Sequence, residues 1–309
     1  MDHGPRLALR ALEAHLPGPL LKASSGDWAN DLRTHDIELL VCGTSDSAHG
    51  RDAEAGAQRA ARALGIPTVV VEDFPGNFAP VSMAPPRLLC VESTFAADLA
   101  RRHMPALAVH VGPAIRYDAL RRDLGALRVA DDTAERAVLW IGQPETADAL
   151  RTLETLLPAL GAGGWKLWFR AHPRDEGYVR GAYGGLPVAD ITSHSLDECL
   201  ARRPRLVITQ FSSVAVEAGF RGIPSLNVLL PEAGGGTLAR KKGYSVPPWC
   251  EEGAAFLVVR RQDVDKILDC ALSSADARGK VMEAFDRYFK VTEQGAPALI
   301  NLLYNQGLL

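Results

Sequence analysis

The sequence predicts an α/β protein made of two domains, each with a parallel sheet covered by helices on both faces. Short runs rich in Val, Ile and Leu alternate with longer amphipathic segments along most of the chain. Such alternation is typical of parallel strands joined by crossover helices. The alternation falls into two series, separated by the polar segment 129–136. With 309 residues, 47% of them hydrophobic, the chain is long enough to form two cores.

Residues 1–128 hold the first series. Each predicted strand is a short apolar run, and each predicted helix is a longer segment with apolar residues at helical spacing. The strands are expected at residues 37–42, 68–71, 88–91 and 107–111. The helices are expected at residues 53–64, 94–103 and 116–127. Residues 1–22 form an amphipathic segment broken by Pro17 and Pro19, and no clear strand with a glycine-rich loop precedes residue 37.

Residues 129–136 are expected to form a linker, because they include Asp131, Asp132 and Thr133 and lack apolar periodicity. The second series fills residues 137–309. Its strands are expected at 137–141, 166–169, 188–191, 206–209, 225–229 and 256–259, with helices at 146–160, 264–272, 277–289 and 296–304. The glycines 234–236 are expected to form a loop. The two series predict two Rossmann-like domains, 1–128 and 137–309, that face each other across a cleft.

Two adjacent serines follow the strand predicted at 206–209. Ser212 and Ser213 stand where a helix begins, and Glu217 lies one turn further along. Hydroxyls and unpaired N–H groups at a helix N-terminus, at the carboxyl end of a parallel strand, favour binding of phosphate or another anion. Glu217 could then reach a ribose diol beside that phosphate. An ordinary N-cap serine on an ordinary helix is the alternative, and the sequence leaves it open.

A histidine follows the strand predicted at 166–169. Pro173 cannot continue that strand and stiffens the turn behind His172, and Arg170 and Arg174 lie nearby. A histidine at this edge can donate a hydrogen bond to a phosphate and, when protonated, also carries charge. A turn histidine with a structural hydrogen bond is the alternative. The His-Pro and Ser-Ser pairs together, each after a strand, are more specific than either pair alone.

The composition limits the possible partners. Lys and Arg number 34 against 37 Asp and Glu, so a net charge of −3 gives no polyelectrolyte argument for nucleic-acid binding. No apolar stretch reaches membrane-spanning length, and the N-terminus lacks the form of a signal peptide. The five cysteines are odd in number and widely spaced, and none has metal-ligand spacing with histidines. We expect a cytoplasmic protein without a transmembrane segment, for which peripheral membrane association stays open.

Several motifs resemble those of glycosyltransferases with the GT-B fold, which consists of two Rossmann-like domains. The nearer likeness is to bacterial surface-carbohydrate proteins that share features with UDP-N-acetylglucosamine 2-epimerases and with Kdo- and sialyl-type transferases. The motifs that carry the resemblance are residues 41–45, 64–77, 111–118, 138–144, 170–173 and 211–217. Compared with that family, the N-terminal domain of this chain looks shortened.

The resemblance implies a nucleotide-sugar site formed mainly by residues 137–309. His172, Ser212 and Ser213 would contact the donor phosphate together with Arg170, and Glu217 would contact the ribose. The donor would be CMP- or UDP-linked, and the acceptor a bacterial glycan. The expected activity is glycosyl transfer. The alternatives are a nucleotide-sugar epimerase or hydrolase of the 2-epimerase type, and a non-catalytic GT-B-like binding protein.

Sugar transfer needs a general base on the acceptor hydroxyl and neutralisation of the charge on the departing phosphate. His172 and the serines can provide the second function, and no Asp-x-Asp metal motif of the usual transferase kind appears in the sequence, so we expect a metal-independent reaction without a cofactor. Asp73, which closely follows the strand at 68–71, is the first candidate for the base. Capping of the turn at Pro75 and Gly76 is its alternative.

The polar loop 43–50 follows the first predicted strand and is bounded by glycines. It could cradle a ligand or form a solvated connection, and the sequence favours neither. Its candidate residues, together with one residue after the strand at 137–141, are Thr44, Ser45, Asp46, His49 and Gln143.

Overall fold

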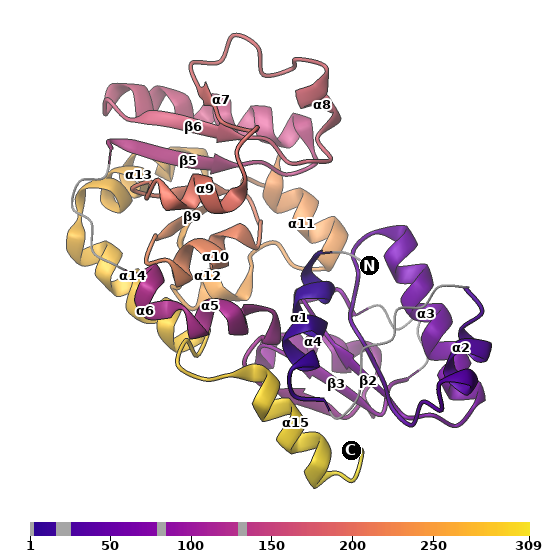
Figure 1. Ribbon diagram of the computed structural model, residues 1–309. Helices are drawn as coiled ribbons and strands as arrows, with labels where there is room; N and C mark the ends of the chain where they lie inside the picture. The colour runs from indigo at the N-terminus through magenta and orange to yellow at the C-terminus, as the bar shows by residue number, and fades with distance from the viewer. Residues whose placement is uncertain (1–2, 17–25, 79–84, 129–134) are drawn as a thin grey trace. The chain divides into compact units, whose positions relative to one another are not determined.

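The computed structural model describes residues 3–16, 26–78, 85–128 and 135–309 (Figure 1). It divides into two compact units: unit 1 comprises Met1–Arg122 with Phe289–Leu309, and unit 2 comprises Asp123–Tyr288. Most of the predicted linker, residues 129–134, lies outside the described residues. The last segment of the chain thus belongs to the same unit as the N-terminal sheet.

Unit 1 contains a parallel sheet with the strand order β1-β2-β3-β4. The strands are β1 (Leu40–Cys42), β2 (Thr68–Val71), β3 (Leu88–Val91) and β4 (Val109–Val111). The helical segments of this unit are α1 (His3–Glu13), α2 (Trp28–Thr34), α3 (Ala48–Ala63), α4 (Thr94–His103), the 3-10 turn η1 (Ile115–Tyr117), α5 (Asp118–Arg122) and α15 (Gly295–Asn305). Because the strands follow one another in sequence order, the described sheet has no point at which the winding reverses.

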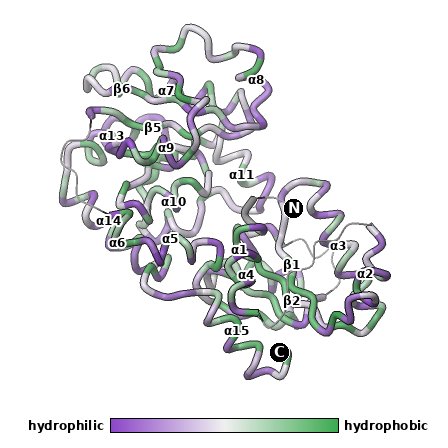
Figure 2. Tube along the Cα trace, in the orientation of Figure 1, coloured by the Kyte–Doolittle hydropathy of each residue, from purple (hydrophilic) through white to green (hydrophobic). Residues whose placement is uncertain are grey.

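Both faces of the unit 1 sheet are apolar. Successive residues of a strand point to opposite faces, and in β2 and β3 the residues on both faces are buried. Val69 and Val71 of β2 pack on one side against α1 and α15, with Leu12 and Leu299 in the same cluster. Val70 packs on the other side, in a cluster that includes residues of α4. Figure 2 shows hydrophobic residues in green along β1 and β2. Two helices from opposite ends of the chain therefore complete one face of this sheet.

A buried ion pair joins α15 to the rest of unit 1. The two carboxylate oxygens of Asp118 accept hydrogen bonds from Gly295 N (2.9 Å) and Ala296 N (2.6 Å), the first residues of α15. Arg121 Nη1 donates to Asp118 at 2.7 Å, and Arg121 Nη2 donates to Phe289 O at 2.8 Å. A carboxylate at a helix N-terminus satisfies N–H groups that have no partner within the helix.

Unit 2 contains a parallel sheet with the order β10-β9-β8-β5-β6-β7. The strands are β5 (Ala137–Ile141), β6 (Lys166–Arg170), β7 (Ala189–Asp190), β8 (Val207–Thr209), β9 (Ser225–Val228) and β10 (Phe256–Val258). The chain winds outward from β5 through β6 to β7, then returns to β8 and winds the other way. This is the strand order of a doubly wound Rossmann sheet, with its switch point between β5 and β8.

Helices cover both faces of the unit 2 sheet. The helical segments of this unit are α6 (Leu124–Leu127), α7 (Thr146–Ala162), α8 (Glu176–Val179), α9 (Leu196–Ala201), α10 (Val214–Phe220), α11 (Gly234–Lys242), α12 (Pro248–Glu251), the 3-10 turn η2 (Arg261–Asp263), α13 (Val264–Ser273) and α14 (Ala275–Tyr288). Trp140 and Phe169 lie in the core on one face, and Leu139 and Trp168 lie on the other.

The predicted fold class is confirmed, and the strands match their predicted ranges closely at most positions. Three helical predictions differ. Helix α3 begins at Ala48 rather than at residue 53, and residues 116–127 form a 3-10 turn and two short helices instead of one helix. The loop predicted at 234–236 is wrong, since α11 begins at Gly234. A Cβ atom on Gly235 would lie 2.5 Å from Leu229 O, so the glycines permit close packing.

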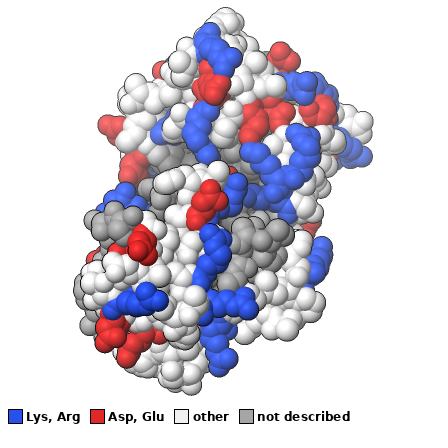
Figure 3. All heavy atoms as spheres, turned by 90° about the vertical axis from the view of Figure 1, so that its right-hand side faces the viewer, with Lys and Arg blue, Asp and Glu red and all other residues white. Residues whose placement is uncertain are grey.

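Charges of both signs are visible at the surface. On the face shown in Figure 3, Asp and Glu side chains lie among Lys and Arg side chains. Within the described residues, no helix is long and apolar enough to cross a membrane.

Candidate functional site

The carboxyl ends of β5 and β8 form the candidate site of unit 2. The two strands pair in parallel, and Thr209 Oγ1 donates a hydrogen bond to Ile141 O at 2.9 Å. In open α/β sheets ligands bind at this edge, where the winding reverses, because the loops on either side of the switch point diverge. The residues that follow these strands are therefore the first to consider.

Gly142 follows β5 and allows the neighbouring backbone to approach closely. A Cβ atom at this position would lie 3.0 Å from the backbone nitrogen of His172, and Gly142 N donates to Arg170 O at 2.9 Å. Gln143, the next residue, is buried. The structure thus brings Gln143, Arg170 and His172 to one part of the sheet edge, although the three residues come from two different strand ends.

His172 is half-buried at the carboxyl end of β6. Its Nδ1 accepts a hydrogen bond from Arg174 N at 3.0 Å, which places the proton of the neutral imidazole on Nε2. Burial and the positive charge of Arg174 lower the pKa of His172, although Glu145 and Asp175 act in the opposite direction. The imidazole is therefore neutral at pH 7 and has one N–H to donate.

The turn behind His172 is fixed by Asp175, which is buried. Asp175 N donates to His172 O at 2.9 Å, and its carboxylate accepts from Gly177 N at 3.0 Å and from the Tyr183 hydroxyl. Thr146 at the start of α7 also donates to this carboxylate. These contacts hold the loop after β6 against the loop after β5, so the position of His172 is set by packed neighbours.

Ser212 and Ser213 lie between β8 and α10, at the helix start that the sequence predicts. Ser212 Oγ accepts from Val214 N at 3.2 Å, and Ser213 occupies the N-cap position without a capping bond from its side chain. Glu217 is half-buried on α10. Gln210, just after β8, is anchored because its carbonyl accepts from Asn227 Nδ2 at 2.8 Å. The predicted phosphate-binding residues thus share one sheet edge, with His172 after β6 and the serines after β8.

A lysine of α11 reaches the same edge. Lys241 Nζ forms an ion pair with Glu145, the residue just before α7. Arg170 Nε donates to His194 O at 3.4 Å, so its guanidinium is directed toward the loop after β7. Two basic side chains thus lie near the candidate site, but Lys241 is paired with a carboxylate and Arg170 is directed toward the loop after β7.

In unit 1, Asp73 belongs to a hydrogen-bonded network. Its Oδ1 accepts from Thr44 Oγ1 at 2.9 Å and from Asn77 Nδ2 at 2.8 Å. Arg116 Nη1 donates to Asp73 O at 2.8 Å and lies 3.8 Å from Oδ2. The carboxylate is thus held in one orientation at the carboxyl end of β2.

The loop residues after β1 have several different environments. Thr44 and Ser45 are buried, and Ser45 binds Glu54 through both its backbone N–H and its hydroxyl, at 2.7 and 2.9 Å. Asp46 and His49 are exposed, and His49 lies in the first turn of α3. The structure therefore brings Thr44 to Asp73, whereas Asp46 and His49 face solvent.

Two carboxyl groups of unit 1 were not singled out from the sequence. Glu72 directly follows β2, and Glu92 directly follows β3. Burial raises the pKa of Glu72 to about 8, against hydrogen bonds from Phe78 N and Gly76 N that lower it. Burial also raises the pKa of Glu92 to about 7, while Arg116 lowers it. Carboxyl groups that titrate near neutral pH are suited to proton transfer.

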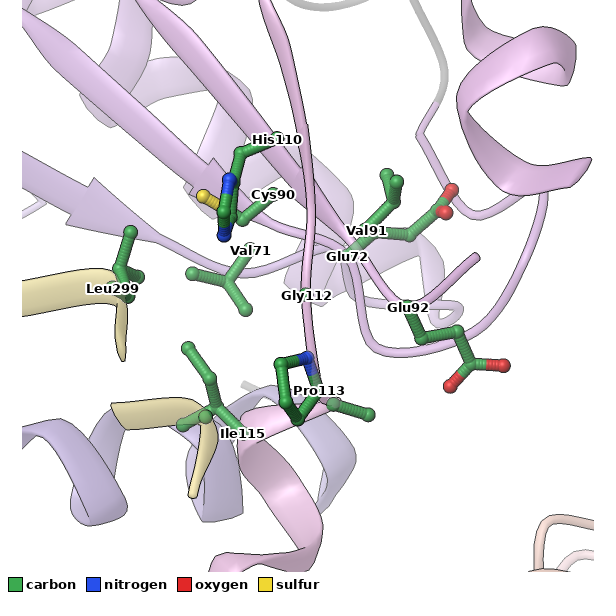
Figure 4. Close-up of a pocket in the computed structure, with 12 residues that line it drawn as sticks. Val71, Glu72, Cys90, Val91, Glu92, His110, Gly112, Pro113, Ile115 and Leu299 are labelled. Atoms are coloured by element: carbon green, nitrogen blue, oxygen red, sulfur yellow. The ribbon is translucent and has the colours of Figure 1, made fainter. Parts of the chain in front are cut away.

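Figure 4 shows how these two side chains lie. Glu72 and Glu92 point to one side of the strand ends, whereas His110, Cys90 and Leu299 lie on the other side. The small cavity between them has a volume of about 20 Å³, which is room for a single water molecule. A charged residue directly after a buried strand was the sequence signal that could have identified both glutamates.

Within the described ranges, no group of three or more His, Cys, Asp or Glu side chains could hold a metal ion.

Known structures share the fold of this chain. A UDP-GlcNAc 2-epimerase from Methanocaldococcus jannaschii, in complex with UDP-GlcNAc and UDP, matches 90% of this chain and 85% of its own, with a TM-score of 0.57 and 15% identity. MurG from Acinetobacter baumannii matches 90% and 77%, with a TM-score of 0.55 and 15% identity. The Anabaena protein HepE, in complex with UDP and glucose, matches 91% and 80%, with a TM-score of 0.53 and 15% identity.

The class defined by these matches is the GT-B-type fold, an α/β architecture with two Rossmann-like units. This confirms the resemblance to GT-B glycosyltransferases and 2-epimerases that was drawn from the sequence motifs. No family model matches the chain, and no curated protein matches it. At these identities the likeness establishes the fold, and a fold of this kind hosts more than one activity.

Proposed function

We propose that the protein is a glycosyltransferase that moves a sugar from a UDP- or CMP-linked donor to a bacterial glycan, in the cytoplasm and without a metal ion. The observation that carries this proposal is the switch point of unit 2. Gly142, His172 and the Ser212–Ser213 pair follow β5 and its two neighbouring strands, at the edge where doubly wound sheets bind ligands. Proteins of the same fold have been solved with UDP bound.

In this proposal the residues of unit 2 bind the donor. Ser212 and Ser213 provide hydroxyls, and backbone N–H groups at the start of α10 face the phosphate. His172 donates its Nε2–H to the same phosphate, which suits a neutral imidazole. Glu217 binds the ribose diol. Together these groups stabilise the charge that develops on the nucleotide when the glycosidic bond breaks.

The general base is proposed to come from unit 1. Asp73 is the first candidate, because its carboxylate is held at a strand end by Thr44, Asn77 and Arg116. It would accept the proton of the acceptor hydroxyl as the new bond to the sugar forms.

A specific observation favours a second candidate function, epimerisation of the nucleotide sugar. Epimerisation removes and returns a proton, and it therefore needs groups that exchange protons near neutral pH. Glu72 and Glu92 have pKa values raised to about 8 and about 7. UDP-GlcNAc 2-epimerases are also among the proteins that share the fold.

The two functions differ in what they release. We would incubate the protein with a panel of UDP- and CMP-sugars, with and without glycan acceptors, and follow free nucleotide and the donor sugar by NMR. Acceptor-dependent release of nucleotide, unchanged by EDTA, is expected for the proposed transferase. Conversion of the donor into its epimer without any acceptor would favour the second candidate. Loss of transfer in EDTA would contradict the metal-independent reaction.

The phosphate contacts are tested by substitution. Replacing Ser212 and Ser213 together with Ala should weaken nucleotide binding by about 1–3 kcal/mol, the scale of hydrogen bonds to a charged group. The matched control is the Ser273–Ser274 pair at the end of α13, where a double Ala variant should bind as the wild type does. Calorimetry measures both. Equal affinity of the two variants, with intact folds, would refute the role of Ser212 and Ser213.

A further inference from the structure

A second polar pocket lies in unit 2, at the sheet edge opposite the candidate site. Its volume is about 200 Å³. It is lined by residues that precede β8, residues that precede β9, and residues of α14, among them Arg203, Arg205, Arg278 and Gly279. Because these segments enter the parallel strands at their amino ends, the pocket is separated from Ser212 by the length of β8.

Three guanidinium groups line this pocket, and each is half-buried. Leu272 O accepts from Arg205 Nε at 3.4 Å and from Arg278 Nη1 at 2.8 Å, so one carbonyl holds both cations. Arg203 donates to Leu127 O at 3.1 Å and to Arg221 O at 3.4 Å. The three side chains are therefore positioned by fixed backbone groups.

Within the described residues, none of the three arginines forms an ion pair with a carboxylate. Neighbouring arginines of the same unit do: Arg128 pairs with Asp286 at 2.6 Å, and Arg221 pairs with Asp197. Burial lowers the pKa of Arg278, and the positive charge of Arg205 lowers it further. The pocket thus concentrates like charges that the described protein groups leave uncompensated.

The backbone contacts use only part of each guanidinium. The carbonyls of Ala271 and Leu272 lie in the last turn of α13, where cations are favourable. Arg278 Nη1 donates a hydrogen bond to both of them. A guanidinium has five N–H donors. Among the described groups, Nη2 of Arg278 and both Nη atoms of Arg205 have no hydrogen-bond acceptor. These donors remain for a ligand.

We propose that this pocket is a binding site for a small oligophosphate, separate from the nucleotide-sugar site. Guanidinium forks match phosphate oxygens in pairs, and three of them suit a ligand with more than one phosphate group. The volume lies below the range of pockets for drug-sized ligands, which fits a compact anion such as pyrophosphate. The pocket is independent of the proposed function, because none of its residues belongs to the candidate site.

The probe is inorganic pyrophosphate, measured by calorimetry on the full chain at low and high salt. The main variant is Gly279→Glu. A Cβ atom at Gly279 would meet nothing within 4 Å, so the new side chain fits without a clash. The variant adds a carboxylate at the pocket and leaves the hydrogen bonds of Arg278 with the end of α13 in place. We expect it to weaken pyrophosphate binding at least tenfold. Gly279→Ala is the matched control and should bind as the wild type does.

Two further variants separate this pocket from the candidate site. Arg205→Gln should also lower the affinity at least tenfold, whereas Arg287→Gln, which removes the same charge from an exposed position of α14, should leave it unchanged. The Ser212→Ala, Ser213→Ala double variant should retain pyrophosphate binding at the arginine pocket.

Three results would overturn the proposal. They are wild-type affinity in both Gly279→Glu and Arg205→Gln, loss of pyrophosphate binding only in the serine variant, and stronger binding of citrate than of pyrophosphate. In each case the nucleotide-sugar assay can still succeed, so the failure of this inference is distinguishable from failure of the proposed function.

Discussion

Glu72 is a buried carboxyl group, and burial disfavours its negatively charged form in the folded protein. It is 7% exposed, and its Oε1 accepts from Phe78 N and Gly76 N at 2.9 and 3.1 Å. Burial raises its pKa from 4.5 to about 8. Between these two pH values the folded state binds more protons than the unfolded state. The stability that Glu72 contributes is therefore complete below about pH 4.5 and is lost as the pH rises to about 8.

Glu72→Gln should remove this loss, because the amide is neutral at every pH and keeps an acceptor for Phe78 N. The melting temperature of the variant, relative to the wild type, should rise between pH 5 and pH 8. Scanning fluorimetry across that range checks it. Glu283→Gln, on the exposed face of α14, should give no such trend. A constant offset between Glu72→Gln and the wild type would contradict the raised pKa.

Single residues were the hardest part of the site to predict. His172, Ser212 and Ser213 belong to short motifs after apolar runs, so the sequence could place them at strand ends. Glu72 and Glu92 are marked in the sequence only by their position directly after an apolar run, and their raised pKa values come from packing that the sequence does not display. The roles of these site residues stay predictions, because the structure shows their positions and contacts but no ligand.

At the scale of elements, Asp118 and Arg121 join α15 to unit 1. Both side chains are almost fully buried, at 5% and 0% exposure. Asp118→Ala would leave Arg121 charged without its partner and would also remove the acceptor of two α15 N–H groups. Breaking a buried pair in this way costs about 3–5 kcal/mol. Chemical denaturation measures the loss.

The control for that experiment is Asp98→Ala. Asp98 lies 3.8 Å from Arg101 on α4, and both side chains are exposed. Exposed pairs contribute about 0–1 kcal/mol, so the control should be nearly as stable as the wild type. Similar losses in the two variants would show that the Asp118–Arg121 pair does not hold α15.

Gly219 sets the distance between α10 and α14. A Cβ atom there would lie 2.1 Å from Phe285. Alanine favours helix more than glycine by about 1 kcal/mol, but overpacking a core costs about 1–3 kcal/mol. Gly219→Ala should therefore lower stability, whereas Gly161→Ala in α7, where a Cβ meets nothing within 4 Å, should not. Higher stability of Gly219→Ala in urea unfolding would refute the tight packing.

Elements with a strong apolar period were predicted well, and the exception at residues 234–236 has a tertiary cause. Most strands of both sheets are short apolar runs, such as Thr68–Val71 and Val207–Thr209, and such runs between longer amphipathic segments predict buried parallel strands. The glycines at 234–236 looked like a loop because glycine disfavours helices. In the structure Gly234 packs on Gln210, and Gly235 and Gly236 pack on backbone carbonyls of residues 229 and 231. Only tertiary contacts reveal that requirement.

At the scale of the whole molecule, the number of sheets followed from the sequence but the division of the chain did not. The predicted bounds assigned the C-terminal helices to residues 137–309, although the resemblance to the GT-B fold also implied that the helix at 296–304 packs back on the first domain. The structure groups Phe289–Leu309 with the first unit. The pairing of α1 with α15 joins apolar faces from opposite ends of the chain, and no local pattern records such a long-range contact.

The contiguous unit 2 leads to a prediction for a fragment. Residues 123–288 contain both apolar clusters of the second sheet and all of the proposed phosphate-binding residues. The fragment should unfold cooperatively in urea and should bind UDP or CMP measurably in calorimetry. A fragment without a cooperative transition would show that unit 2 needs unit 1 to fold.

The discontinuity of unit 1 also determines the order in which the domains finish folding during synthesis. Residues 1–122 leave the ribosome first, but Leu299 and Leu303, which cover their sheet, leave last. At about 5–20 residues per second, translation of the intervening segment takes on the order of 10–30 s. For that time one apolar face of the first sheet has only α1 to cover it and lacks α15, while the later-encoded unit can already fold. A chaperone that shields Val69, Val71 and Leu12 during this interval would protect the chain from aggregation.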